Sequence, residues 1–158
     1  MPNFYFMGVQ FFHLMALAIW VGGMVIIMFI AAPAIFKRLE SRTLAGEITG
    51  EILRKFDIIV FFCISALVIT GIIKYLNWEN PTPWIIMRYM AILVMSLSAI
   101  YSSGIISPKM RSLKSKISSF DTLPENNHNR IAFNQLHRIS SICMFLNLIC
   151  GIISILLA

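Results

Sequence analysis

Charged residues are scarce in this 158-residue chain: they make up 13% of it, whereas hydrophobic residues make up 58%. A soluble domain of this size could not bury that much apolar surface, so the composition excludes that class of protein. The basic residues fall between long apolar runs rather than along one stripe, which excludes nucleic acid as the expected partner. We therefore expect an integral membrane protein whose first partner is the lipid bilayer.

Cysteine is also rare, and the three cysteines Cys63, Cys143 and Cys150 all lie inside apolar runs. An odd number of membrane-buried cysteines excludes a disulfide framework. The sequence also lacks a phosphate-binding glycine loop, a metalloprotease motif and a serine or cysteine hydrolase signature. We therefore do not expect an enzyme of these classes.

Four apolar runs are present, over about residues 4–35, 57–76, 84–107 and 131–157. Each is close to or above the roughly 20 residues that an α-helix needs to cross a bilayer. The runs predict one all-α domain, an integral membrane four-helix bundle. The third run is expected to end at Pro108.

The connections between these runs differ in length and character. Residues 77–83 form a short, turn-like connection, which predicts that the second and third spans are antiparallel neighbours. Residues 44–56 favour either a short interfacial helix that runs into the second span or a plain solvated loop. Thr122 and Glu125 fit a capping box, so the last helix is expected to begin before the membrane.

The distribution of Lys and Arg predicts the orientation. Loops 36–56 and 108–130 hold five of these residues each, whereas loop 77–83 and the stretch before His13 hold none. Because basic loops stay in the cytoplasm, both termini are expected on the outer, periplasmic side.

The most unusual stretch of the first run is residues 13–23. His13 lies at membrane depth, where ionisable side chains are rare and usually have a functional role. Trp20 follows seven residues later, two helical turns along the same face, and the pair Gly22 and Gly23 allows a close helix approach. We expect His13 to face the bundle interior with Trp20 and to point toward the start of the third span.

An outer layer of candidate ligands should surround His13, drawn from Lys74, Tyr75, Met87, Arg88, Met90 and Cys150. Imidazole combined with thioether or thiol suits copper or haem iron, and an arginine can hold an anionic group such as a haem propionate. The predicted cofactor-binding set is His13, Trp20, Met87, Arg88 and Met90, and the predicted metal ligands are His13, Met87, Met90 and Cys150. The alternative is that the sulfur-bearing residues are ordinary core packing.

An inner layer should lie near His137, at the other end of the bundle. The depths of His13 and His137 in the membrane should differ by roughly 15–25 Å. The two histidines would then be too far apart to bind one haem iron together. Asp57, Tyr101, His137 and Arg138 are expected to form this polar cluster, which could relay protons or bind a small polar ligand. Alternatively, Asp57 and Arg138 only mark the membrane interface.

Residues 13–23 resemble the first-helix motif of the bacterial copper-resistance D (CopD-like) family: a His, six apolar residues, a Trp, one residue and a Gly pair. The membrane-bound protoporphyrinogen oxidase family of bacteria (HemJ-like) has a similar His and Trp in a four-span bundle. Residues 133–141, with Asn147, are similar to the last-helix motif of a four-span family of unknown function. Animal members of that family are associated with platinum-drug resistance, and residues 44–46 and Phe56 also fit its first inner loop.

These resemblances imply a multi-pass protein of the bacterial inner membrane that is associated with haem b or copper. The positions of this sequence that match the motifs of these families are His13, Trp20, Gly22, Gly23 and His137. The sequence leaves two alternatives open. One is a non-catalytic accessory subunit of a larger membrane complex or a homo-oligomer, docking through the small residues Ala16, Gly23 and Ala31. The other is a HemJ-like porphyrinogen oxidase.

Overall fold

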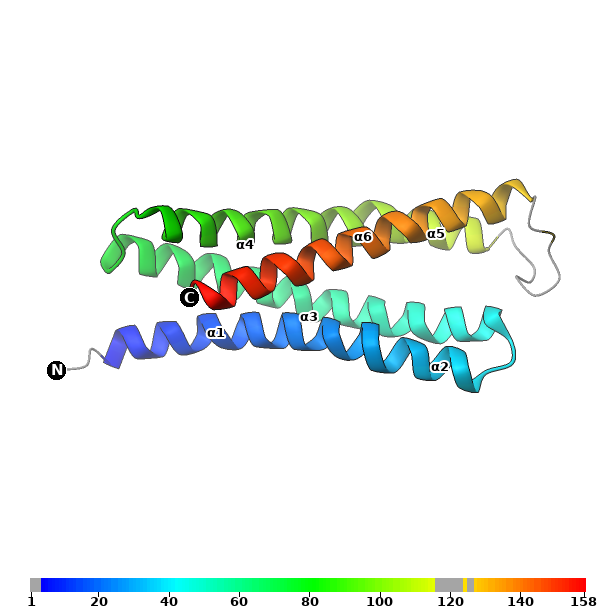
Figure 1. Cartoon of the computed structure of the whole chain (residues 1–158), viewed down its shortest axis with the longest axis horizontal. Coiled ribbons are helices and arrows are strands. Elements are labelled where there is room, and N and C mark those ends of the chain that lie inside the picture. Colours follow the sequence, from blue (N-terminus) through cyan, green and yellow to red (C-terminus); the bar gives the residue numbers. More distant parts are fainter. Residues whose placement is uncertain (1–3, 116–123, 125–126) are drawn as a thin grey trace.

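The computed structural model describes residues 4–115, 124 and 127–158, and the described residues are almost entirely helical (Figure 1). In chain order the elements are α1 (Phe4–Val25), the π-helical segment η1 (Ile26–Ala31), α2 (Ala32–Arg38), α3 (Arg42–Asn77), α4 (Pro83–Tyr101), the π-helical segment η2 (Ser102–Ile106), α5 (Ser107–Lys114) and α6 (His128–Leu156). The structure is therefore all-α, as the sequence predicts.

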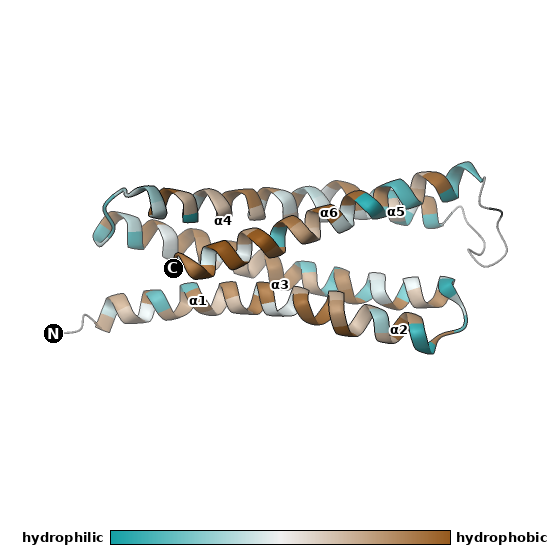
Figure 2. Cartoon of the chain, viewed as in Figure 1, coloured by the Kyte–Doolittle hydropathy of each residue, from teal (hydrophilic) through white to brown (hydrophobic). Residues whose placement is uncertain are grey.

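Within the described residues, four continuous helical stretches are long and apolar enough to cross a membrane: Phe4–Arg38, Arg42–Asn77, Pro83–Lys114 and His128–Leu156. Most of their apolar side chains are not buried inside the bundle, which is the arrangement that lipid contact requires. Hydrophobic residues fill the middle of the bundle and hydrophilic residues gather toward its two ends (Figure 2). The chain is thus a multi-pass membrane protein.

The helices form two pairs. α1 packs along α3, and α4 packs along α6, while contacts between α1 and α6 join the pairs. The start of α1, the end of α6 and the connection between α3 and α4 lie at one end of the bundle, which we call the His13 end (Figure 1). The end of α2, the start of α3, the end of α5 and the start of α6 lie at the other end, called the basic end. This antiparallel arrangement agrees with the prediction, whereas the side of the membrane that each end faces stays a prediction.

The core lies between the two pairs, around Leu17, Trp20, Leu67 and Met95. Small residues of α1 contribute to it. Ala16 is buried, and a Cβ atom added at Gly23 would overlap the ring of Phe56. Ala16 and Gly23 therefore pack within the bundle and do not form an external docking surface as predicted, whereas Ala31 is half-buried and its part in docking stays a prediction.

The third helical stretch does not end at Pro108, contrary to the prediction. It passes through η2 and continues as α5 to Lys114, with the proline in the first turn of α5. The same pattern occurs earlier, where η1 precedes Pro33. Prolines lack a backbone N–H, and the altered hydrogen-bond ladder of a π-helical turn accommodates that loss without breaking the helix.

The helix starts differ partly from the predictions. α3 begins at Arg42 and runs unbroken into the membrane span, and the Ser41 hydroxyl oxygen accepts from the Leu44 N–H at 3.3 Å. Residues 44–56 are therefore helical rather than a plain loop. The side chain of Asn127 caps α6 by accepting from the Asn129 N–H. The predicted capping box of Thr122 and Glu125 lies outside the described residues.

Candidate functional site

His13 is fully buried, with 0% of its surface exposed, and it contacts α3. Its Nδ1 lies 2.8 Å from Thr70 Oγ1, and the Thr70 hydroxyl donates to the Ala66 carbonyl at 2.6 Å. Because that hydroxyl proton is used on the backbone, Oγ1 must accept from Nδ1–H, which places the lone pair of the neutral ring on Nε2. Nε2 is buried and has no hydrogen-bond partner among the described residues.

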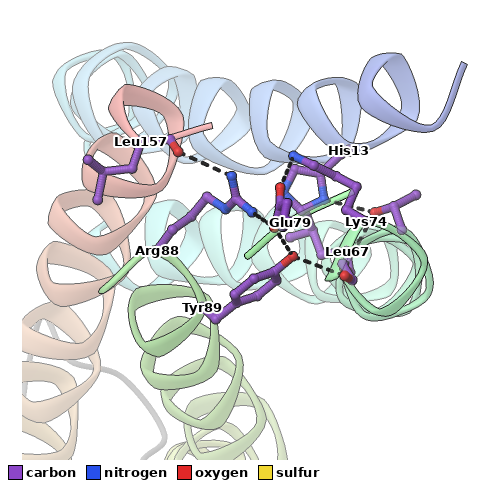
Figure 3. Close-up of polar contacts among 9 residues, drawn as sticks. His13, Leu67, Lys74, Glu79, Arg88, Tyr89 and Leu157 are labelled. Carbon is purple, nitrogen blue, oxygen red and sulfur yellow. Dashed lines mark hydrogen bonds and ion pairs between the residues drawn. The ribbon is translucent and has the colours of Figure 1, made fainter. Parts of the chain in front are cut away.

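Glu79 is the centre of an ion cluster next to this histidine (Figure 3). Its Oε1 lies 3.2 Å from Lys74 Nζ, and its Oε2 accepts hydrogen bonds from Arg88 Nη2 and, at 2.7 Å, from the Tyr89 hydroxyl. Lys74 and Arg88 are only 1% and 3% exposed. Charges buried this deeply at membrane depth are costly unless they are paired, and Glu79 pairs both of them.

The same cluster connects several helix ends. The Tyr89 hydroxyl also lies 3.0 Å from the Gly71 carbonyl of α3, and Arg88 Nη1 donates to the Leu157 carbonyl at the end of α6 at 3.2 Å. A Cβ atom at Gly71 would lie 3.1 Å from the Tyr89 ring, so the absence of a side chain at Gly71 leaves room for that ring. α3, α4 and α6 are therefore held together at the His13 end through polar contacts.

The cluster carries one more positive than negative charge, because Lys74 and Arg88 share a single carboxylate. Burial opposes ionisation of Glu79. Hydrogen bonds from Arg88 and Tyr89 and the charges of Lys74 and Arg88 outweigh that effect and lower the pKa of Glu79 from 4.5 to about 2. The charges of Lys74, Arg88 and Glu79 also act on His13. The surroundings of Nε2 therefore favour a ligand with negative charge.

The structure brings together only part of the predicted outer layer. His13, Lys74 and Arg88 meet at the cluster, and Trp20 and Cys150 are buried in the core. The hydrogen-bond partner of His13 comes from α3, and the charge of Arg88, at the start of the third span, also acts on the ring.

Met87 and Met90 are 42% and 53% exposed, and Tyr75 is also exposed. The helical period explains this result: with Arg88 turned inward, the residues one before and two after it turn toward the outside of the bundle. Across the described ranges, no group of three or more His, Cys, Asp or Glu side chains is placed to hold a metal ion.

Thr70, Glu79 and Tyr89 were missed by the sequence reasoning. One signal could have found Glu79: it is the single carboxylate in the sequence between Asp57 and Asp121, and it lies between the two cations Lys74 and Arg88. A lone carboxylate in an apolar hairpin that also contains two cations is an expected ion-pair partner. Thr70 and Tyr89 carry no comparable signal, because both residue types occur widely in membrane helices.

The predicted inner layer lies at the basic end, far along the bundle from His13. Asp57, Ser103 and His137 line one cavity of about 480 Å³ there. Tyr101 and Arg138 are exposed and lie outside the cavity lining. His137 stacks on Phe133, with ring centroids 6.4 Å apart and an interplanar angle of 5°.

Residues 15–119 match the protein family described as Domain of unknown function (DUF4149), which is more than half of the chain. The match includes Lys74, Glu79 and Arg88, whereas His13 and α6 lie outside it. No curated protein and no solved structure matches the chain.

Proposed function

The chain belongs to this family of unknown function, and we propose that it is a haem b-associated membrane protein in which His13 would bind the iron. The observation that supports this proposal most directly is the buried, unpartnered Nε2 of His13. Histidines that bind metals are commonly fixed by a hydrogen bond from the other ring nitrogen, which is the bond that Thr70 accepts. Such a haem would supply one-electron chemistry to the protein.

The charges around His13 favour haem over a copper ion. Lys74 and Arg88 would repel a bare metal cation, whereas ferric haem b carries net negative charge because of the porphyrin and its two propionates. Arginine is well suited to hold a propionate. The thioethers that a copper ion would need are exposed on Met87 and Met90. The charges around His13 and the exposure of the two thioethers therefore support haem over copper in this proposal.

A non-catalytic accessory subunit is the second candidate. It is favoured by one observation: the Glu79 cluster joins the ends of α3, α4 and α6, a structural role that needs no cofactor. A HemJ-like porphyrinogen oxidase would use the same site as the haem proposal, and it adds the requirement that the protein oxidises a porphyrinogen. The haem proposal does not need that added activity, and it accounts for the unpartnered Nε2 of His13, which the accessory role does not.

Haem binding can be tested by titrating hemin into the purified protein in lipid nanodiscs. We expect saturable binding with a sharp Soret band for the wild type, and loss of that band for His13→Ala. His128→Ala is the matched control, because His128 begins α6 at the opposite end of the bundle. Equal hemin binding by the wild type and His13→Ala would contradict the proposal. Failure of the wild type to bind hemin would contradict it too and would favour the accessory role.

A further inference from the structure

The cavity at the basic end has no part in the proposed haem site. It lies between α3, α5 and α6 and has a volume of about 480 Å³. Leu53, Met110, Phe133 and Met144 give it apolar walls, while charged and hydroxyl side chains make up much of the remainder. A cavity of this size with a few converging polar groups is typical of a ligand site.

One wall of the cavity is the bare backbone of α3. Gly46 and Gly50 lie one helical turn apart and both line the cavity. A Cβ atom at Gly50 would meet nothing within 4 Å, and one at Gly46 would meet only Lys114 Nζ, at 4.0 Å. Two glycines at this spacing usually let a second helix pack closely in a membrane. Here they face open space instead, so the glycines leave room for a ligand.

Two of the three carboxylates in the cavity lining already have cationic partners. Lys114 Nζ lies 3.7 Å from Glu47 Oε1, and Lys55 Nζ lies 3.0 Å from Glu51 Oε1. Lys55 is not part of the lining, so it adds positive charge from outside.

Asp57 is the third carboxylate, and it lies within electrostatic reach of Arg111. Arg54 also lines the cavity, so the lining and Lys55 together have one cation in excess. Ser103, Ser107 and Ser140 add hydroxyl groups that can donate hydrogen bonds. Arginine and serine donors beside an excess of positive charge are the groups that bind a phosphate ester.

We propose that this cavity binds the headgroup of an anionic phospholipid. Arg54 and Arg111 hold the phosphate, and an acyl chain lies along Phe133 and Met144. Basic pockets between membrane helices are known to hold such headgroups. The apolar walls argue for a lipid over free phosphate, because a free anion gains nothing from contact with Phe133 and Met144.

Native mass spectrometry of the detergent-purified protein tests this proposal. The protein is titrated with phosphatidylglycerol and separately with phosphatidylcholine. We expect a single high-affinity phosphatidylglycerol adduct and only weak, unsaturated phosphatidylcholine adducts. Gly50→Leu should lose the high-affinity adduct, because its side chain fills the cavity while favouring the helix. Gly8→Leu is the matched control, because Gly8 is an exposed glycine on α1 with nothing within 4 Å of an added Cβ.

A second variant tests the charges. Arg54→Gln combined with Arg111→Gln should weaken the phosphatidylglycerol adduct at least about tenfold, since each charge-assisted hydrogen bond is worth a factor of that order. Equal affinity for the two lipids, or an unchanged adduct in Gly50→Leu, would overturn the proposal. Displacement of the lipid by millimolar inorganic phosphate would also overturn it, because the site would then recognise the free anion.

Discussion

His13 Nδ1 lies 2.8 Å from the hydroxyl oxygen of Thr70, and the proton of that hydroxyl is committed to the Ala66 carbonyl. The two residues come from different helices, α1 and α3, and are 57 positions apart in the sequence. Their contact fixes both the orientation and the tautomer of the imidazole. It leaves the ring lone pair on Nε2, which has no hydrogen-bond partner among the described residues.

Replacing Thr70 by Val should remove the acceptor for Nδ1–H and leave a buried donor without a partner. We expect a loss of about 1–3 kcal/mol in the free energy of unfolding, together with weaker hemin binding. Thr49→Val is the control, because the Thr49 hydroxyl also donates to a carbonyl four residues earlier but lies far from His13. Denaturant unfolding in detergent and hemin titration measure the two effects. An unchanged hemin affinity in Thr70→Val would show that Thr70 does not position the ring.

Glu79→Gln should be strongly destabilising, because it leaves two buried cations without their counter-charge. A loss of about 3–5 kcal/mol is expected for a buried pair that is broken from one side. The double variant Lys74→Met with Glu79→Gln should lose less than the sum of the two single variants, because the second change removes one unpaired cation. Unfolding midpoints of the four proteins in the cycle measure this coupling. Simple additivity would mean that Lys74 and Glu79 do not depend on each other.

The stability contributed by Glu79 should depend on pH. Folding lowers the pKa of this carboxyl from 4.5 to about 2, so the folded state favours the ionised form. The contribution is therefore complete above the unfolded pKa of 4.5 and is lost as the pH falls from 4.5 through about 2. The difference in unfolding free energy between the wild type and Glu79→Gln, measured across that range, should shrink as the pH falls. A constant difference would contradict the ionised state of Glu79.

Two neighbouring glycines of α1 should respond differently to substitution. A Cβ atom at Gly23 would overlap the Phe56 ring, whereas one at Gly22 would meet nothing within 4 Å. Gly23→Ala should therefore cost about 1–3 kcal/mol through overpacking, and Gly22→Ala should be neutral or slightly stabilising. Thermal unfolding of both variants checks the difference. Combining Gly23→Ala with Phe56→Leu should restore part of the loss, and no recovery would mean that another contact limits Gly23.

The orientation of the bundle can be tested with single cysteines in a variant that lacks the three natural ones. A cysteine at Asn80, in the short connection without Lys or Arg, should react with a membrane-impermeant thiol reagent added to intact cells. A cysteine at Ser115, beyond the basic α5, should react only after the membrane is permeabilised. The reverse pattern would place both basic connections outside.

The sequence predicted the four membrane helices well because their signal is local: long apolar runs leave few other structures possible in lipid. It failed at Pro108, because a π-helical turn just before the proline cannot be read from residue types. The burial of His13 and Trp20 followed from helical spacing. The sequence wrongly favoured Met87 and Met90 as neighbours of His13 and missed Thr70 and Glu79. Which residues surround His13 depends on how α4 rotates about its axis and on which helix packs beside α1, and neither can be predicted from helical spacing.

The most direct test of the account is the absorption spectrum of the full-length protein as purified from its native membrane, compared with His13→Ala purified in the same way. The account predicts a Soret band in the wild type and its loss in the variant, while far-ultraviolet circular dichroism shows equal helix content. The His13→Ala variant lacks the buried Nε2 atom, so this comparison measures how far the Soret band depends on that atom. A colourless wild type, or a variant that keeps the full band, would contradict the account.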